Sequence, residues 1–396
     1  MEKERILGLP KNIFFLGLTS LFNDFSSEMV FSIFPAFFTS VLKAGAQSLG
    51  FVDGIAEAAS NLFKIYSGVL SDKFQKRKGL VVSGYTLSVI TRPFYLLVST
   101  VGGALGLRFL DRVGKGLRDA PRDAIISLST PREELGRSFG YHRAMDTVGA
   151  ILGPLAAYLL LSRFPLHFNL VFITAFAVGI FAIATLFFIK DVVIATASRR
   201  VSLLRSFTEL SLQFKLYLLS LFILSIGTLP IVVLLLKTES IGLVIASIPL
   251  FYMVYNVSYA GFSMSAGKIS DRIGARFVIF AGYVILMASY LVLNFAHSSS
   301  VLVFGFLLMG LFPALTDGVQ RAFAAELSKE NLRGGALGWL NAVSGIGALI
   351  AGIGGGYLWQ IYGPTTAFFV ASTITTLGLL FFFLSSFANE KISGKV

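Results

Sequence analysis

The chain has 396 residues, of which 55% are hydrophobic and 14% are charged, and its formal net charge is +12. A soluble protein of this length carries about a quarter charged residues, so the composition indicates a polytopic membrane protein. The chain contains no cysteine, which excludes disulfides, thiolate metal sites and redox motifs.

Apolar runs of about twenty residues recur along the chain, and this is the length that a bilayer requires of a helix. The first run begins at Ile13. It is too long for a signal peptide and no small-residue cleavage site follows it, so we expect a retained first helix. We predict twelve spans, near residues 13–41, 48–70, 79–98, 101–126, 138–161, 166–189, 212–236, 241–266, 277–296, 300–325, 334–358 and 365–387.

The longest predicted connection, 190–211, lies between the sixth and seventh spans, and the halves that it joins repeat each other. Without a gap, a shift of 199 residues superposes Gly68 on Gly267, Asp72 on Asp271, Arg77 on Arg276 and Gly153 on Gly352. The predicted fold class is therefore an all-α membrane protein, with twelve transmembrane helices in two pseudo-symmetric six-helix bundles. The bundles are 1–189 and 212–396, joined by a cytoplasmic linker, and this is a transporter architecture.

The distribution of the basic residues explains the positive charge if both termini are cytoplasmic. The predicted outer loops then hold three Lys and Arg, at Lys43, Arg163 and Lys237, whereas the predicted inner segments and span ends hold 25. Cytoplasmic loops of membrane proteins carry such an excess. The charge therefore indicates no nucleic-acid partner, and no segment is long enough for a separate soluble domain. We expect a multi-pass protein surrounded by the lipid of the cell (inner) membrane.

Two predicted cytoplasmic loops share a pattern, GVLSDKFQKRK at 68–78 and GKISDRIGAR at 267–276. Both resemble the signature that joins helices two and three, and again eight and nine, in the major facilitator superfamily. The first copy has Gln75 where the second glycine belongs, and the second has Ala275 at a basic position. The resemblance implies a conformational role for Gly68, Asp72, Arg77, Gly267, Asp271, Arg272 and Arg276.

Two membrane segments of the first half carry further motifs. RVGKGLRDA at 112–120 partly resembles the family's fourth-helix motif, with Lys115 in place of its glutamine. GAILGPLAA at 149–157 resembles the fifth-helix motif of the family's antiporters, although Ala157 and Tyr158 replace its final glycines. The stretches FNDFSSEM and DRVGKGLRDAPRD resemble a widespread prokaryotic branch of the superfamily. The fifth-helix resemblance implies antiport, with conformational roles for Gly149, Gly153 and Pro154.

Eight charged residues lie close together in LRFLDRVGKGLRDAPRD at 107–123. On a helical wheel at 100° per residue they occupy about 140° and the opposite side is apolar, which predicts a membrane helix with one charged face. A charge at mid-membrane costs about 2.5–3.5 kcal/mol on the insertion scale and requires a partner. Partners are available mainly in the first half. We expect a substrate cavity that contains Asp53, Glu57, Arg92, Arg108, Asp111, Lys115, Asp146 and Asp317.

Two acids, Asp24 and Glu28, lie one helical turn apart in the first span. Similar antiporters place an acid there, near the fourth-helix arginine, which corresponds to Arg112. Neighbouring carboxylates repel and burial disfavours their charge, so at least one of them can bind a proton, whereas a nearby arginine opposes protonation. If Arg112 approaches or leaves the acids during transport, their proton affinity changes, which coupling requires. We therefore expect these three residues to form the proton-coupling site.

These features predict a secondary active transporter and not an enzyme. GKGLRD lacks the spacing of a phosphate loop, and three dispersed His without Cys disfavour a zinc site, so we expect no cofactor and no metal. The motifs favour a proton-coupled exporter of amphipathic organic compounds that works as a monomer by alternating access. Organic-anion transport, efflux of a hard metal cation, and an uncoupled lipid flippase or sensor remain alternatives.

Overall fold

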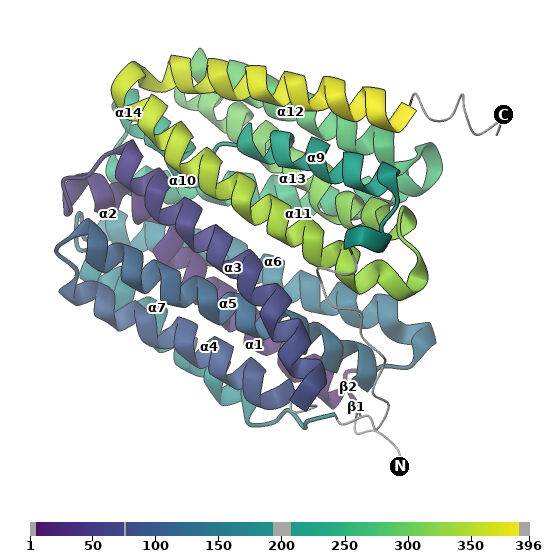
Figure 1. Cartoon of the computed structure of the whole chain (residues 1–396). Helices are drawn as coiled ribbons and strands as arrows, with labels where there is room; N and C mark the ends of the chain where they lie inside the picture. Colours follow the sequence, from purple (N-terminus) through teal and green to yellow (C-terminus); the bar gives the residue numbers. More distant parts are fainter. Residues whose placement is uncertain (1–4, 75–76, 193–206, 388–396) are drawn as a thin grey trace. The chain divides into compact units, whose positions relative to one another are not determined.

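The computed structural model describes residues 5–74, 77–192 and 207–387, and most of them are helical (Figure 1). A short antiparallel hairpin pairs β1 (Arg5–Ile6) with β2 (Leu9–Pro10) immediately before the first helix. Gly8 lies in its turn with φ of 76°, a left-handed conformation that glycine adopts without strain.

The helices of the first half follow the predicted spans in order. They are α1 (Lys11–Ser32), α2 (Phe34–Ser40), α3 (Ala46–Phe74), α4 (Arg77–Phe94), η1 (Tyr95–Leu97), α5 (Val101–Ser129), η2 (Arg132–Glu134), α6 (Leu135–Arg163) and α7 (Phe168–Leu186). The first predicted span, 13–41, is divided into α1 and α2. Pro35 lies in the first turn of α2. Proline has no backbone N–H with which to continue the hydrogen bonds of α1, and in the first turn of α2 that N–H would have no partner within the helix.

The helices of the second half also follow the predicted spans. They are α9 (Leu212–Ile226), α10 (Ile231–Ser240), η3 (Ile245–Ser247), α11 (Ile248–Ile273), α12 (Ala275–Asn294), α13 (Ser299–Glu326), η4 (Glu330–Leu332) and α14 (Arg333–Phe387). The last two predicted spans, 334–358 and 365–387, are joined in α14. The backbone turns sharply at Gly363, where φ is 85°, and Pro364 follows. Glycine tolerates this φ, and proline begins the next helix.

Seven helical stretches of the described residues are long and apolar enough to cross a membrane. They are Arg77–Leu97, Leu135–Arg163, Phe168–Leu186, Leu212–Ser240, Ala275–Asn294, Ser299–Glu326 and Arg333–Ser385. α1, α3, α5 and α11 are less apolar because they carry charged or other polar side chains. With 22, 29, 29 and 26 residues they are nevertheless long enough for a hydrocarbon core of about 30 Å. The predicted all-α membrane fold of twelve spans is confirmed.

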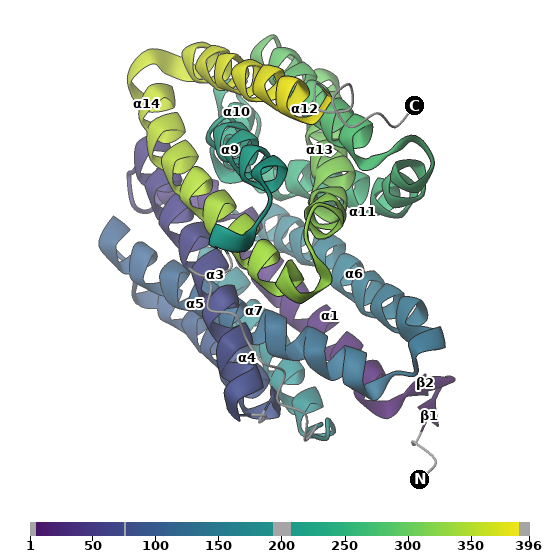
Figure 2. The ribbon, with the colours of Figure 1, turned by 45° about the vertical axis from the view of Figure 1, so that its right-hand side comes forward.

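The described residues form two compact units. Unit 1 draws on Met1–Ala44, Ala59–Ser198 and Val244–Met253, and unit 2 draws on Gly45–Ala58, Arg199–Leu243 and Val254–Val396. Within unit 1, α1 packs along α6 and α7, and α4 packs along α5 (Figure 2). Within unit 2, α9 packs along α14, and α12 packs along α13. A buried apolar cluster of unit 1 joins four of its helices and consists of Ile13, Leu16, Val81, Tyr85, Ile125, Ile126, Leu186 and Ile189.

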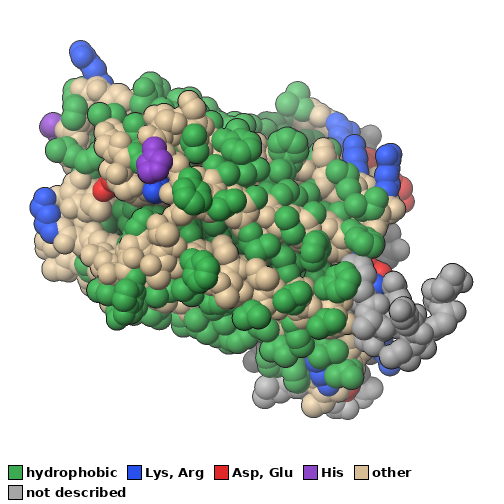
Figure 3. Space-filling view, turned by 90° about the horizontal axis from the view of Figure 1, so that it is seen from above, with side chains coloured by type: hydrophobic (Ala, Val, Ile, Leu, Met, Phe, Trp, Pro, Cys, Tyr) green, Lys and Arg blue, Asp and Glu red, His purple; other side chains and the backbone are tan. Residues whose placement is uncertain are grey.

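Large hydrophobic side chains are exposed on both units. Leu97, Phe187 and Phe369 are 78%, 79% and 71% exposed. On the face drawn in Figure 3, hydrophobic side chains spread across the surface, and the Lys and Arg side chains lie toward its two ends. An apolar surface of this extent on a helical protein is suited to contact with lipid.

Candidate functional site

The charged face of α5 is turned into unit 1, as the helical wheel predicts. Arg108, Arg112 and Arg118 are 3%, 7% and 4% exposed. Arg118 donates a hydrogen bond to Ser88 Oγ at 2.8 Å, and its guanidinium lies 4.4 Å from the centre of the Tyr85 ring. α4 therefore supplies both a polar acceptor and an aromatic face for this buried cation.

Asp111 is the ion-pair partner of two of the arginines. Its Oδ2 atom lies 3.5 Å from Arg108 Nη1 and 4.0 Å from Arg112 Nε. Phe31 of α1 contributes to the same group, because the guanidinium carbons of Arg108 and Arg112 lie 4.2 Å and 5.6 Å from the centre of its ring. Arg112, the predicted control of the proton site, thus lies within ion-pair distance of its neighbour on α5.

A second group of ion pairs lies further along α5. Asp119 is 3.2 Å from Lys64 Nζ of α3 and 3.4 Å from Arg122 Nη1, and Arg122 is also 2.9 Å from Asp123. Lys115, between the two groups, is half-buried. Pairing of each carboxylate with at least one cation offsets much of the cost of burying these charges.

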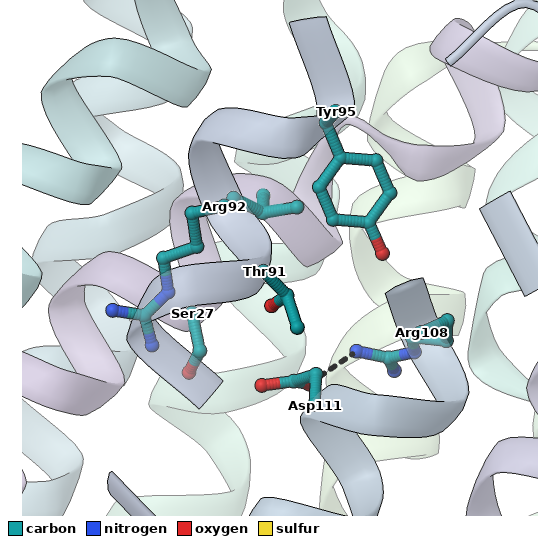
Figure 4. Close-up of a pocket in the computed structure, with 7 residues that line it drawn as sticks. Ser27, Thr91, Arg92, Tyr95, Arg108 and Asp111 are labelled. Carbon is teal, nitrogen blue, oxygen red and sulfur yellow. Dashed lines mark hydrogen bonds and ion pairs between the residues drawn. The ribbon is translucent and has the colours of Figure 1, made fainter. Parts of the chain in front are cut away.

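A small cavity lies between α1, α4 and α5 (Figure 4). Its volume is about 10 Å³, which is the space needed by a single water. In Figure 4, the guanidinium of Arg108 points toward Asp111, on the side of the cavity opposite Arg92. The cavity is lined by Ser27, Val30, Thr91, Arg92, Tyr95, Arg108 and Asp111.

Arg92 is connected to the first predicted acid through an amide. It is 2% exposed, and its Nη2 donates hydrogen bonds to the backbone oxygen and to Oδ1 of Asn23, at 3.3 and 3.0 Å. Asn23 Nδ2 in turn donates to Asp24 Oδ1 at 3.1 Å. Because Arg92 only donates, the amide oxygen of Asn23 faces Arg92 and its NH₂ group faces Asp24. Sequence reasoning missed Asn23, although its position next to Asp24 was a signal.

The second predicted acid accepts a hydrogen bond from a tyrosine that is distant in sequence. Tyr252, in the first turns of α11 that belong to unit 1, donates its hydroxyl to Glu28 Oε2 at 2.7 Å. The Tyr252 ring lies edge-on to Phe31, with 5.2 Å between ring centres. Nothing in the sequence singles out this tyrosine.

Asp146 of α6 lies against α1. Ser20 Oγ donates a short hydrogen bond to Asp146 Oδ1, and Asp146 Oδ2 lies 3.5 Å from His142 Nδ1 and 3.4 Å from Arg143 Nη1. The side chain of Asp146 is 13% exposed, whereas that of Arg143 is 76% exposed. Asp146 is therefore part of the α1–α6 contact, and Ser20 is a second polar residue that sequence reasoning did not identify.

The glycines of the fifth-helix motif allow α1 and α6 to approach closely. A Cβ added at Gly149 would lie 2.5 Å from the carbonyl oxygen of Leu21 and 3.1 Å from Asp24 Cβ. A Cβ added at Gly153 would lie 2.6 Å from the carbonyl oxygen of Phe25. Only glycine fits these positions at this separation. The motif thus lies directly against the turns of α1 that carry the predicted proton site, and Pro154 follows within the same helix.

The remaining predicted cavity residues belong to unit 2. Asp53 is buried and Glu57 half-buried on the part of α3 that groups with unit 2. Asp317 of α13 is exposed and accepts a hydrogen bond from Tyr259 at 3.1 Å, also in unit 2. Nearby, Gln320 donates to the hydroxyl of the buried Tyr283 at 2.9 Å.

The residues of the two loop motifs differ in their burial and in the contacts that they make with other residues. In the first, Arg77 is 8% exposed and donates a hydrogen bond to the carbonyl oxygen of Val192 at 2.9 Å. A Cβ added at Gly68 would lie 3.7 Å from Ala120 Cβ. The side chain of Asp72 lies outside the described ones. In the second motif, Gly267 is half-buried, whereas Asp271 and Arg272 are exposed. The Arg276 guanidinium lies 6.0 Å from the centre of the Phe323 ring.

Comparison with known proteins identifies the family. The model of the Major Facilitator Superfamily matches residues 16–251 and again 216–395. An uncharacterized MFS-type transporter of Methanocaldococcus jannaschii is 35% identical over 383 residues, or 95% of each chain. A class B tetracycline resistance protein of Escherichia coli is 32% identical over 133 residues, 33% of each chain. The fold matches a crystal structure of a mutant of the nucleoside transporter NupG with a TM-score of 0.81, at 15% identity, over 94% of this chain and 99% of that one. The chain therefore belongs to the major facilitator superfamily, and it is a multi-pass membrane transporter.

Proposed function

We propose that this transporter is a proton-coupled exporter of amphipathic organic compounds in the cell membrane. The observation that carries the proposal is the position of Asp24 and Glu28, which lie on α1 where the antiporter-like glycines Gly149 and Gly153 of α6 pack against it. Proton binding at these acids and movement of α6 are then coupled by direct contact. The partial similarity to a protein named for tetracycline resistance supports export of organic compounds.

The proposed mechanism is alternating access. The bundles 1–189 and 212–396, joined by the cytoplasmic linker 190–211, rock against each other about a central pathway while α6 shifts against α1 within the first bundle, and both termini lie in the cytoplasm. The proton changes the charge of the α1 acids, and Arg112 opposes protonation when it is near them. A monomer contains every element that this cycle requires. Protons and the organic substrate are its small-molecule partners, and lipid surrounds it.

Organic-anion transport is the second candidate, and one observation favours it. Arg92 and Arg108, which are 2% and 3% exposed, both line the cavity between α1, α4 and α5. Two buried guanidinium groups present planar donors that suit a carboxylate or phosphate. Hard-cation efflux has no such support, because within the described residues no group of three or more His, Cys, Asp or Glu is suited to hold a metal ion.

The two candidates are separated by transport into sealed vesicles. The purified protein is reconstituted, an acidic interior is imposed, and uptake of tetracycline, ethidium and carboxyfluorescein is measured with and without a protonophore. We expect uptake of tetracycline or ethidium that disappears when the proton gradient collapses. Uptake of carboxyfluorescein alone favours the organic-anion candidate. Uptake of a transported probe that proceeds at the same rate with and without the proton gradient contradicts proton coupling.

The residues of the proton site are tested with Asp24→Asn and Glu28→Gln in the same vesicles. At least one variant should lose gradient-driven uptake while exchange of the probe without a gradient survives. Glu326→Gln is the matched control, because Glu326 is an exposed carboxylate at the end of α13. Full gradient-driven uptake by both single variants and by the double variant contradicts this assignment.

A further inference from the structure

A carboxylate of α6 lies about one helical turn from the level of the first acid of α1. Ser20 is one turn before Asp24 on α1, and Ser20 Oγ donates a hydrogen bond to Asp146 Oδ1. One turn beyond Asp146 on α6, a Cβ added at Gly149 would lie 3.1 Å from Asp24 Cβ. Asp146 therefore meets α1 one turn before Asp24, and the two carboxylates belong to one tight helix–helix contact.

The contact is partly shielded from water and rich in charge. Asp24 is half-buried, and the side chain of Asp146 is 13% exposed. The other titratable or charged groups that act on this pair come from four helices and are Glu28 of α1, Tyr85 and Arg92 of α4, Lys115, Arg118, Asp119 and Arg122 of α5, and His142 and Arg143 of α6.

We propose that Asp24 and Asp146 bind one proton between them, so that the proton-coupling site extends from α1 to α6. Two carboxylates in one poorly solvated contact repel when both are ionised, and a shared proton removes this repulsion. They titrate as a pair and not as two independent acids. The inference rests on the proposed proton coupling and adds Asp146 to the residues that carry it.

The pair also explains how the proton and the movement of the helices are connected. Gly149 holds α6 against α1 next to Asp24, and Asp146 is one turn away on the same helix. When α6 is displaced from α1, the two carboxylates separate, their repulsion falls and the shared proton is released. A difference in proton affinity between two conformations is what coupling requires. Asp24 and Glu28, by contrast, lie on the same helix, so the distance between them does not change when α6 moves. Their mutual repulsion therefore cannot make proton affinity depend on the position of α6.

The experiment measures the proton directly, without any substrate. The full chain is reconstituted in lipid, and infrared spectra are recorded while pH is varied, following the carbonyl band of protonated carboxylic acids. Asp24→Asn, Asp146→Asn, the double variant and the control Glu326→Gln are compared, and each is first checked for native elution and unfolding temperature. We expect a band near neutral pH in the wild type and the control that both single variants lose, with no further loss in the double variant.

Each outcome decides the inference. A band that persists near neutral pH in Asp146→Asn, or two independent losses that add in the double variant, overturns it. If one single variant fails to fold, the other makes the reciprocal test, because a shared proton is lost whichever acid is replaced. The test is separate from the proposed function. If the band is lost in both single variants but transport by the wild type does not depend on the proton gradient, the shared proton is supported and proton coupling is contradicted. If proton-driven transport is unchanged in Asp146→Asn, the shared proton is contradicted as part of the coupling site, whereas proton coupling itself is retained.

Discussion

Replacing Gly149 with alanine places a methyl group where the backbone of α1 already lies. The new Cβ would be 2.5 Å from the carbonyl oxygen of Leu21 and 2.8 Å from the backbone nitrogen of Phe25. Carbon atoms make ordinary contacts at about 3.5 Å or more, so α1 and α6 must separate by about 1 Å at this level. The neighbouring atoms belong to helical backbone, which cannot rotate away as a side chain does.

Two opposing effects determine how much Gly149→Ala changes the free energy of unfolding. Overpacking of a close contact costs about 1–3 kcal/mol, whereas alanine in place of glycine favours a helix by about 1 kcal/mol. We expect Gly149→Ala to lower the free energy of unfolding by up to about 2 kcal/mol. The same separation moves Asp24 from Asp146, so proton-driven uptake should fall even at temperatures where the variant remains folded.

The assay is denaturant unfolding of the purified protein in detergent micelles, followed by circular dichroism. Gly140→Ala is the matched control, because Gly140 lies on the same helix and a Cβ there meets no atom within 4 Å among the described residues. The control should be stabilised by up to about 1 kcal/mol. Equal shifts of the two variants would refute the close α1–α6 contact on which the coupling argument depends.

Three further predictions follow from single contacts and from the charge distribution. Tyr252→Phe removes the hydroxyl that donates to Glu28 Oε2 at 2.7 Å, so it should shift the pH profile of tetracycline uptake while changing the free energy of unfolding by about 1 kcal/mol; an unchanged profile argues against a role for Glu28 in proton binding. Asn12→Ala removes hydrogen bonds to Ser129 Oγ and to the backbone of Lys190, so it should lower the free energy of unfolding by about 1–2 kcal/mol without changing proton dependence; a changed proton dependence contradicts a structural role. Single cysteines at Ser198 and Ser299 test the orientation in intact cells, where an impermeant maleimide should label position 299 only; labelling of 198 alone reverses the predicted topology.

Much of the fold follows from local pattern. Most of the spans are predictable because a membrane helix needs an apolar stretch of about bilayer length, and such stretches recur along the chain. The inward face of α5 is predictable because its charges repeat with the helical period, and the arginines at 108, 112 and 118 are indeed buried. The division of the first span is less predictable, since Pro35 is compatible with either a kink or a break.

The connections of the candidate site are harder to predict, because they depend on which helix faces which. Asn23 and Ser20 are neutral residues in a polar stretch, and their importance comes from Arg92 and Asp146, which approach from other helices. Tyr252 reaches Glu28 from more than two hundred positions away. A helical wheel gives the face on which a residue lies but not the residue opposite it on another helix. The sequence therefore suggested a proton site with both acids on α1, whereas the structure also brings Asp146 of α6 against α1.

The most direct test of proton coupling through the α1 acids is proton movement caused by substrate alone. Vesicles that contain the protein and an internal pH indicator start without any gradient, and tetracycline or ethidium, whichever is transported, is added outside. The account predicts that probe entry is accompanied by proton exit, seen as a rise in internal pH that Glu28→Gln or Asp24→Asn abolishes and Glu326→Gln retains. Probe entry with no change in internal pH in the wild type would contradict it.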